Sequence, residues 1–466
     1  MENGKRYDVV VMGGGPGGYV AAIRAAQLGN TVAIVEKDAL GGICLNWGCV
    51  PTKALLRDSE VLHLVKNSDL YGISIPDFKV NFKASVERSR KVASRLSKGV
   101  EYLMKKNSIR HLQGTASLVS PGEVQVTHVG RDPALLKAGH VIIATGARNM
   151  ELPGLEMDGK RIVSSKEAMI LEKVPKRMII IGAGAIGVEF ASLYHEYGTE
   201  IHLVEMLPHI LPQEDEEISR VLGNLFEKRG INIHTSTRVE KAEALKTKVK
   251  VHISSGDETS VLDGDIALVA VGVQGNVENL GLEKAGVQVE SGWINVDEYC
   301  KTTVDRLYAI GDVIGPPWLA HVASAQGRLV AEHLSGKNPQ PINMDHIPAC
   351  TYSRPQVASL GMTEQEARQA GYEMKVGRFP MTANGKALAY GEPDGMVKVI
   401  VDSRYGELLG CHIIGMEATE LIAEIGVAQT LETTYVEILQ TVHAHPTLSE
   451  SIMEAVAQAN GEAIHI

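Results

Sequence analysis

Two stretches of the chain show the same alternation of apolar runs and helical spacing. Residues 8–12, DVVVM, lead into glycines, then into YVAAIRAAQLG, and then into the apolar run TVAIVE that ends at Glu36. Residues 178–205, MIIIGAGAIGVEFASLYHEYGTEIHLVE, repeat this order and end at Glu205. A short apolar run, a segment with helical spacing and a second apolar run are typical of a β–α–β unit. The pattern therefore predicts two such units.

Both units place glycines where a dinucleotide-binding loop needs them. The first glycine allows a tight turn, the second lets a pyrophosphate approach the backbone, and the third brings the helix against the strand. An acidic residue at the end of the second strand is placed to bind ribose hydroxyls. The first glycine and the acid are 23 residues apart in both copies. The chain therefore binds two dinucleotides or arose by duplication of a domain that did. The predicted positions are Gly13, Gly15, Gly18 and Glu36, and Gly182, Gly184, Gly187 and Glu205.

The acid of the second unit indicates which nicotinamide cofactor it takes. Glu205 would repel a 2′-phosphate, and residues 206–211, MLPHIL, hold no Arg or Lys to attract one. We therefore predict NAD(H) over NADP(H). Later, in LYAIGDVIG, Asp312 suits a hydrogen bond to a ribityl or phosphate group of a large cofactor, although Gly-Asp alone is also a common turn.

Two of the five cysteines, Cys44 and Cys49, stand in GGICLNWGCV. They are chance neighbours, a zinc pair, or a disulfide that opens and closes. No second Cys or His pair has zinc-ligand spacing, and the HxH of His443 and His445 lacks an acidic partner pattern, so we expect no metal site.

A redox disulfide fits this segment better. Residues five apart in a regular helix have Cα atoms about 8 Å apart, beyond the reach of a disulfide. A bridge therefore needs a distorted turn, which Gly48 helps supply, and a strained bridge is more easily reduced. Lys53, four residues further on, would stabilise a thiolate or a reduced cofactor; otherwise it is an ordinary exposed helix lysine.

Composition narrows the class of protein. A chain of 466 residues is too long for a single hydrophobic core, and its length predicts three or four domains. With 44% hydrophobic and 22% charged residues, the profile is that of a soluble α/β enzyme. A net charge of −10 without a basic block argues against nucleic acid as a partner. No stretch has the pattern of a membrane span or a signal peptide, so we expect a cytoplasmic protein.

The segment GGICLNWGCVPTKALL resembles the active-site segment of the pyridine nucleotide–disulfide oxidoreductases. The resemblance continues through IIATGA at 142–147, Glu189 after the second glycines, AIGD, and HAHPTLSE near the end. Within the family the chain is closest to the enzymes that oxidise dihydrolipoyl groups. The resemblance implies FAD in the first site, NAD in the second, and electron transfer from a dithiol through the cysteine pair and FAD to NAD⁺.

Roles follow from the resemblance residue by residue. It implies that Cys49 faces the flavin, that Cys44 exchanges with substrate, and that Lys53 lies by the flavin and pairs with Glu189. The other implied cofactor-binding positions are Ala116, Thr145, Gly146, Gly272, Asp312 and Ala320.

The motif HAHPTLSE supplies a candidate base. A dithiol must lose protons to attack a disulfide, and His445 is suited to accept them, with Glu450 holding its other nitrogen. His443 is more consistent with a structural role. In the family this pair reaches the site of the other subunit, which implies a homodimer. The implied partner is the lipoyl-bearing subunit of a 2-oxo acid dehydrogenase complex or of the glycine cleavage system.

We predict four parts: a FAD domain at 1–148, an NAD domain at 149–272, a segment completing the FAD site at 273–343, and a dimerisation domain at 344–466. The fold class is α/β, with two doubly wound dinucleotide-binding domains and an α+β dimerisation domain. In that last domain, strands are expected at 396–401 and 408–414 and a helix near 417–430.

Two alternatives remain open, another FAD-dependent disulfide reductase and a catalytically idle flavoprotein scaffold. The chain also departs from the family at Gln274 and Gly275, where a basic residue and a proline are usual.

Overall fold

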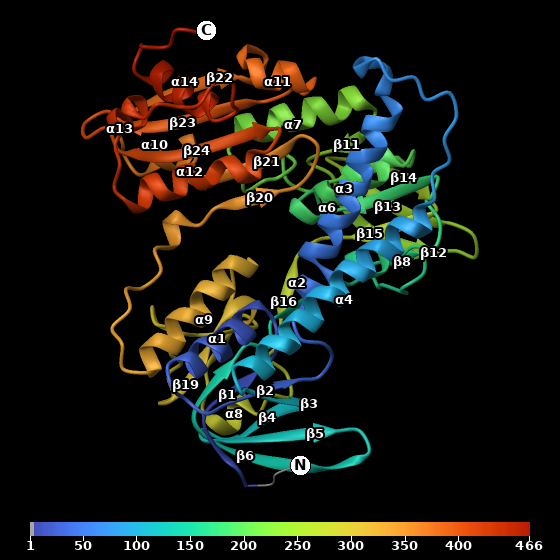
Figure 1. Cartoon of the computed structure of the whole chain (residues 1–466). Coiled ribbons are helices and arrows are strands. Elements are labelled where there is room, and N and C mark those ends of the chain that lie inside the picture. The colour runs from blue at the N-terminus through green and yellow to red at the C-terminus, as the bar shows by residue number, and fades with distance from the viewer. Residues whose placement is uncertain (1–3) are drawn as a thin grey trace. The chain divides into compact units, whose positions relative to one another are not determined.

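The computed structural model describes residues 4–466, without the side chain of Arg131 (Figure 1). It contains two compact units, each assembled from separate segments of the chain. No helix in residues 4–466 combines the length and apolarity needed to cross a membrane. The first unit comprises Met1–Ala54, Ala84–Met150 and Gly272–Ile342, and the second comprises Leu55–Lys83, Glu151–Val271 and Asn343–Ile466. The four-part division expected from the sequence stays a prediction.

A seven-stranded sheet forms the centre of the first unit, with the order β3-β2-β1-β6-β5-β4 and β19 paired with β6. Strands β3, β2, β1, β6 and β19 run parallel, whereas β4 and β5 are antiparallel additions. The bounds are β1 Arg6–Met12, β2 Val32–Glu36, β3 Arg110–Gln113, β4 Thr115–Ser120, β5 Glu123–His128, β6 Arg131–Ile143 and β19 Leu307–Ala309.

Strand β1 is apolar at successive positions because both of its faces are buried. Val9 and Val11 belong to one hydrophobic cluster, and Val10 and Met12 belong to another. A continuous apolar run is what a central parallel strand requires, since helices or further layers cover both sides of the sheet.

Helices α1 (Pro16–Gln27) and α9 (Ala320–Leu334) pack closely in this unit. A Cβ at Gly327 would lie 2.5 Å from the carbonyl oxygen of Gly17, and a Cβ at Gly17 would lie 3.0 Å from that of Ala323. The helices cross where neither has a side chain, so α9 reaches the backbone of the helix that follows the first glycine loop. The other elements here are α2 Gly42–Trp47, α4 Phe82–Lys106, β7 Ala147–Asn149, β16 Val273–Gly275, α8 Leu282–Ala285, β17 Val289–Glu290, β18 Trp293–Ile294 and η2 Gly311–Ile314.

The second unit contains a five-stranded parallel sheet of order β11-β10-β9-β15-β8, with α6 (Ala185–Glu196) and α7 (Glu216–Arg229) after β9 and β10. This is the second doubly wound domain. Its strands are β8 Ile162–Val163, β9 Arg177–Ile181, β10 Glu200–Val204, β11 Asn232–His234 and β15 Ile266–Val269. A three-stranded antiparallel sheet follows, made of β12 Arg238–Ala244, β13 Val249–Ser255 and β14 Glu258–Gly264.

An antiparallel sheet of order β20-β21-β24-β23-β22 makes the C-terminal part of this unit. Strands β23 (Met396–Asp402) and β24 (Leu408–Gly415) and helix α12 (Ala418–Thr430) lie where the sequence predicted them. The predicted fold class, α/β with an added α+β part, is therefore confirmed. The other elements are α3 Cys49–Lys66, which enters from the first unit, η1 Ser68–Tyr71, α5 Ser165–Ala168, η3 Met344–His346, β20 Ala349–Thr351, β21 Gln356–Gly361, α10 Glu364–Gln369, β22 Met374–Pro380, η4 Met381–Ala383, α11 Gly385–Tyr390, α13 Tyr435–Gln440 and α14 Glu450–Ala459.

Candidate active site

The first glycine loop leaves no room for side chains at two of its three glycines. Gly13 has φ +109°, and a Cβ there would lie 2.2 Å from the carbonyl oxygen of Ala144. At Gly18 a Cβ would lie 2.0 Å from the carbonyl oxygen of Gly13. Gly15, which caps α1, has no heavy atom within 4 Å of its Cβ direction. The loop thus leaves open space before the N-terminus of α1, where a pyrophosphate is favoured by free N–H groups.

Glu36 is held in place by the loop it follows. Its Oε2 accepts a hydrogen bond from the Gly14 N–H at 2.7 Å, and its Oε1 accepts one from the Asp38 N–H at 2.8 Å. The side chain is buried. Two backbone donors fix the carboxylate, and its remaining lone pairs suit the ribose hydroxyls that the sequence assigned to it.

The second glycine loop repeats this construction. A Cβ at Gly182, φ +98°, would lie 2.4 Å from the carbonyl oxygen of Ala270, and one at Gly187 would lie 1.9 Å from that of Gly182. Gly184 is open and caps α6. Oxygens of Glu205 accept hydrogen bonds from the Ala183 N–H at 2.7 Å and the Leu207 N–H at 2.9 Å.

Two further predicted positions, Thr145 and Gly146, follow β6, and a third, Gly272, directly precedes β16. Thr145 Oγ1 donates to the Asn276 carbonyl, and the Asn276 side-chain amide donates to the Thr145 carbonyl, both at 2.9 Å. The Asn276 N–H donates to the Gly146 carbonyl at 2.9 Å, and Gly272 accepts from the Met150 N–H at 3.1 Å. The segment at 142–147 is therefore tied to β16. No pattern in the sequence indicated a role for Asn276.

Asp312 lies in η2, directly after β19 and a glycine, as the sequence indicated. Burial raises the pKa of its carboxyl group. Within residues 4–466 no donor is hydrogen-bonded to this carboxylate, so it suits a hydroxyl group of a large cofactor. Ala320 begins α9, next in the chain, and Ala116 is buried in β4.

The departure at Gly275 has a local physical reason. A Cβ there would lie 2.5 Å from the carbonyl oxygen of Gly292 and 3.1 Å from the ring of Trp293. Arg148 donates to the Gly275 carbonyl at 2.8 Å. A larger residue at 275 would displace the turn that carries Trp293, so the departure goes with a tight contact between β16 and β18.

The cysteine segment breaks where the sequence required a distortion. Helix α2 ends at Trp47, Gly48 takes φ −147° and ψ −118°, and α3 begins at Cys49. A Cβ at Gly48 would lie 3.3 Å from the Cα of Cys44. The break brings the Cys49 side chain close enough to Cys44 to raise the pKa of the Cys44 thiol.

The glycine pair before the cysteines attaches this segment to the first dinucleotide loop. The Gly41 N–H donates to the Gly14 carbonyl at 2.8 Å. At Gly42, φ +57°, a Cβ would lie 2.7 Å from the Cα of Gly15. The redox pair therefore stands on the same backbone that would hold the cofactor's phosphates.

Both cysteines are thiols in this structure, with Cys44 half-buried and Cys49 exposed. The hydrogen bond with Cys49 and burial raise the pKa of Cys44, while the nearby Lys53 ammonium acts in the opposite direction. The role of Lys53 in stabilising a thiolate or a reduced cofactor stays a prediction.

Arg90 on α4 supports the loop between the cysteines, and the sequence offered no signal for it. Its guanidinium donates to the Asn46 carbonyl and lies over the Trp47 ring, 3.9 Å from the centroid. The Asn46 side chain in turn donates to the carbonyls of Leu40 and Gly42 at 3.1 and 3.0 Å.

His445 and Glu450 lie together in the second unit. His445 Nδ1 and Glu450 Oε1 are 2.9 Å apart, and the Thr447 N–H donates to Glu450 Oε2 at 2.7 Å. Burial acts to raise the pKa of Glu450, but the hydrogen bonds from Thr447 and His445 outweigh it and the pKa is lowered. An ionised Glu450 accepts a hydrogen bond from the protonated Nδ1, which leaves Nε2 of the exposed imidazole as the basic nitrogen. His443, by contrast, is buried against Glu424 at 2.9 Å, which suits a structural role.

Glu189 is buried on α6 and accepts a hydrogen bond from the Tyr352 N–H at 3.0 Å. It belongs to the second unit and Lys53 to the first, so their pairing stays a prediction.

Two family models together cover most of the chain. The model described as pyridine nucleotide-disulphide oxidoreductase matches residues 7–327, and the dimerisation domain of the same family matches 347–456. The chain belongs to this family. It is an oxidoreductase that uses FAD and NAD(H), and the matched dimerisation domain supports a homodimer.

Relatives match over nearly their whole length. The chain is 47% identical to a dihydrolipoyl dehydrogenase of Zymomonas mobilis and 48% identical to one of Rhizobium etli, covering 98% of this chain and 99% of each relative. A crystal structure of LpdA from Mycobacterium tuberculosis matches with a TM-score of 0.90 and 28% identity, over 97% of this chain and 99% of the other. The HOCl-induced flavoprotein disulfide reductase RclA from Escherichia coli matches with a TM-score of 0.86 and 26% identity, over the same shares.

Proposed function

We propose that the protein oxidises dihydrolipoyl groups carried by another protein and passes the two electrons to NAD⁺. The observation that carries this proposal is the thiol pair at the Gly48 break, set on the loop of a dinucleotide site. Relatives named dihydrolipoyl dehydrogenase, 44–48% identical over almost the whole chain, support the substrate class.

The cysteines carry the dithiol exchange. With Cys44 and Cys49 joined as a disulfide, a substrate thiolate attacks the Cys44 sulfur, the Cys44–Cys49 bond breaks, and Cys49 leaves as a thiolate. The second substrate thiolate then attacks the substrate sulfur bound to Cys44, which forms the lipoyl disulfide and releases Cys44. Both cysteines are then in the reduced state. FAD bound at the first glycine loop would supply the two-electron transfer between the reduced cysteine pair and NAD⁺.

Proton transfer falls to His445. Its Nε2 accepts a proton from the substrate dithiol, and Glu450 stabilises the imidazolium that forms. Because His445 is 79% exposed in a single chain, it is available to a site completed by a second copy, as the family resemblance implies.

The cofactor sites fit their groups in the same way. Gly13, Gly15, Gly18 and Glu36, with Asp312, would hold FAD, while Gly182, Gly184, Gly187 and Glu205 would hold NAD. We propose a lipoyl-bearing subunit of a 2-oxo acid dehydrogenase complex or of the glycine cleavage system as the partner, in the cytoplasm.

The direct test follows NAD⁺ reduction by the purified FAD-loaded protein with dihydrolipoamide, beside NADP⁺ and beside NADPH with oxidised glutathione. We expect turnover with NAD⁺ and dihydrolipoamide. Activity only with NADPH and glutathione would contradict both the substrate and the cofactor assignment.

A variant pair separates the relay from the fold. Cys44→Ser should keep bound FAD, seen in the visible spectrum, and lose dihydrolipoamide oxidation. Cys350→Ser, at a half-buried cysteine in β20, should keep both. Lipoamide turnover that survives in Cys44→Ser would rule out the relay.

A further inference from the structure

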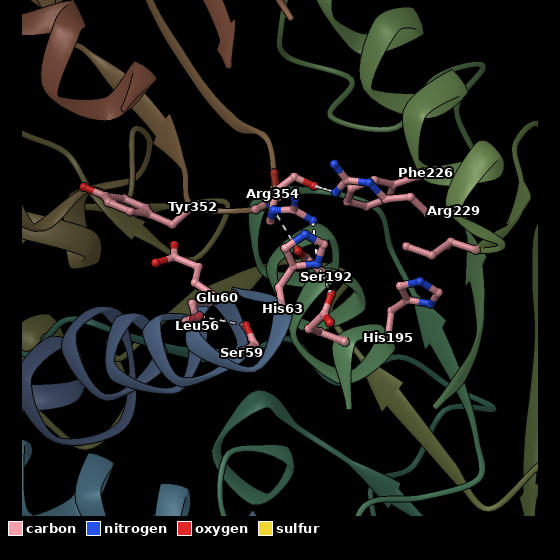
Figure 2. A pocket seen from close by; sticks show the side chains of 13 residues that line it. Leu56, Ser59, Glu60, His63, Ser192, His195, Phe226, Arg229, Tyr352 and Arg354 are labelled. Carbon is pink, nitrogen blue, oxygen red and sulfur yellow. Dashed lines mark hydrogen bonds and ion pairs between the residues drawn. The ribbon is translucent and has the colours of Figure 1, made fainter. Parts of the chain in front are cut away.

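A cavity lies in the second unit, at the end of α6 opposite to the glycine loop. Its volume is about 180 Å³, and its walls come from α3, α6, the end of α7 and residues 352–354 (Figure 2). Neither the glycine motifs nor the proposed dithiol chemistry uses these side chains.

The acidic groups on the wall already have cationic partners. Glu196 accepts from Lys66 Nζ at 3.2 Å and stands 3.3 Å from His63 Nδ1, and its pKa is lowered to about 2, because these contacts outweigh burial. Glu60 pairs with Arg57 at 2.8 Å. The Glu196 and Glu60 carboxylates therefore have fewer free lone pairs to accept hydrogen bonds from a ligand in the cavity.

Arg354 is also paired with other side chains. Its NH2 donates to both oxygens of Glu392, at 2.8 and 3.0 Å, and its NH1 lies 3.0 Å from His63 Nδ1. This arginine therefore shapes the wall, and its charge is compensated by Glu392.

Three hydrogen-bond donors on the same wall, in Arg229, Ser192 and His195, are not fully paired within the part of the protein that the structure describes. Arg229 gives one N–H to the Arg354 carbonyl, but its NH2 is 3.8 Å from Asp394 Oδ2, beyond hydrogen-bond distance. Burial and the neighbouring Arg354 charge lower the pKa of Arg229, although the Asp394, Glu392 and Glu196 carboxylates act to raise it. Ser192 Oγ accepts the Arg354 N–H at 3.0 Å. Within residues 4–466, neither the Ser192 hydroxyl proton nor the His195 ring is hydrogen-bonded.

The remaining wall is apolar. Leu56, Phe226 and Ile231 are each buried and line the cavity. In Figure 2, Arg229 and His195 lie on one side of the view, and Glu60 and Tyr352 lie on the other. Donors without acceptors therefore gather at one end, next to hydrocarbon.

We propose that this cavity binds a small organic anion, whose carboxylate or phosphate accepts hydrogen bonds from Arg229, His195 and Ser192. A group rich in acceptors satisfies donors that the protein leaves unpaired. The cavity is smaller than the 300–1,000 Å³ typical of drug-sized ligands, which limits the anion to a few heavy atoms. Leu56, Phe226 and Ile231 contact its short carbon chain. This inference is independent of the proposed dihydrolipoyl activity.

The test measures binding directly by isothermal titration calorimetry of butanoate, and separately of inorganic phosphate, to the FAD-loaded dimer. Saturating NAD⁺ is present so that phosphate cannot occupy the second glycine loop, and chloride is held at constant ionic strength. Saturable binding of butanoate, with phosphate competing or not, supports the site, and the two arms show which head group it prefers.

Variants locate the binding. Arg229→Gln should weaken the affinity at least about tenfold, as expected for the loss of a charge-assisted hydrogen bond. His195→Gln, which removes no hydrogen bond seen in the structure, should weaken it by about threefold. Arg220→Gln, an exposed position on the same helix α7, makes the same charge change and should leave binding unaltered.

Two results would overturn the proposal. One is that neither anion binds saturably to the wild-type dimer at concentrations up to about 10 mM, roughly the weakest affinity expected of a small-ligand site. The other is equal weakening in Arg229→Gln and Arg220→Gln, which would indicate a general effect of net charge. If Arg229→Gln is poorly folded by circular dichroism, His195→Gln alone decides.

Discussion

The two glycine loops have the same local geometry but different surroundings. In both, the third glycine packs against the carbonyl oxygen of the first. A Cβ would lie only 2.0 Å from that oxygen at Gly18 and 1.9 Å from it at Gly187. In both, a buried glutamate receives two backbone hydrogen bonds. The loop that binds a dinucleotide is therefore repeated in detail.

The surroundings differ. The helix of the first loop is covered by α9, which meets Gly17 through Gly327, and the cysteine segment approaches the loop backbone at Gly15 through Gly42. In the second loop, Ile186 stands at the position that corresponds to Gly17 in the first. The Ile186 side chain is 42% exposed, so no helix in residues 4–466 covers it as α9 covers Gly17. One loop geometry thus suits a cofactor enclosed by the fold and a cofactor that enters and leaves, depending on what packs around it.

The largest effect is expected where the two loops are alike. Gly18→Ala and Gly187→Ala each force a Cβ into a carbonyl, a clash that costs about 1–3 kcal/mol or more. Gly18→Ala should yield protein without FAD and with a lowered melting temperature. Gly187→Ala should stay yellow but raise the KM for NAD⁺ at least about tenfold, since the NAD loop alone is distorted.

Absorbance at flavin wavelengths and NAD⁺ kinetics measure these outcomes. Gly223→Ala serves as the control, because it lies in α7 with no heavy atom within 4 Å of the added Cβ. Equal loss of FAD in both loop variants would break the assignment of one cofactor to each loop.

The next effect tests the cover over the first loop. Gly327→Ala places a Cβ 2.5 Å from the Gly17 carbonyl and should loosen α9, destabilising the fold by about 1–3 kcal/mol. FAD should then dissociate on dilution, which flavin fluorescence detects. Gly99→Ala on α4, where the added Cβ meets nothing within 4 Å, should keep its FAD; equal release from the two variants would argue against α9 as a cover.

A smaller effect concerns the acid of the second loop. Glu205→Gln removes the charge that opposes a 2′-phosphate and weakens hydrogen bonds worth roughly 1.5–3 kcal/mol. The kcat/KM for NAD⁺ should fall about tenfold, and the preference for NAD⁺ over NADP⁺ should shrink. Steady-state kinetics with both nucleotides measure this, and exposed Glu227→Gln on α7 is the control. An unchanged ratio would remove Glu205 from cofactor choice.

The smallest effect is expected at the open side of the second loop. Ile186→Ser should change the free energy of unfolding by less than about 0.5 kcal/mol, as exposed substitutions usually do. Gly17→Ser, its counterpart in the first loop, places a Cβ 3.0 Å from the Ala323 carbonyl and should weaken FAD retention. Thermal unfolding with and without added FAD distinguishes them, and matching shifts would mean that the two loops are equally enclosed.

Local patterns carried most of what the sequence revealed. The strands and glycine loops were predictable because their signals lie within one β–α–β unit, and the Gly48 break followed from the distance that two cysteines must span. Both rest on neighbouring residues, where spacing and backbone geometry are tightly linked.

Contacts between distant segments were not predictable. Arg90 lies 44 residues from the carbonyl it binds, and no periodicity marks it. Asn276 meets Thr145 only because β16 pairs with β7. The unusual Gly275 became understandable only once Trp293 was seen against it. Such partners are chosen by tertiary packing, which a single sequence does not encode in any local pattern.

The discontinuity of the first unit has a consequence for biosynthesis. Its sheet lacks β19 until the ribosome has passed residue 309, and its first loop lacks α9 until the ribosome has passed residue 334. The five-strand sheet of the second glycine loop is complete in the chain by residue 269. At 5–20 residues per second, the ribosome takes on the order of 10 to 40 s to travel from β6 to α9. The loop made first is therefore the one enclosed last, after the strands around the second loop have been synthesised.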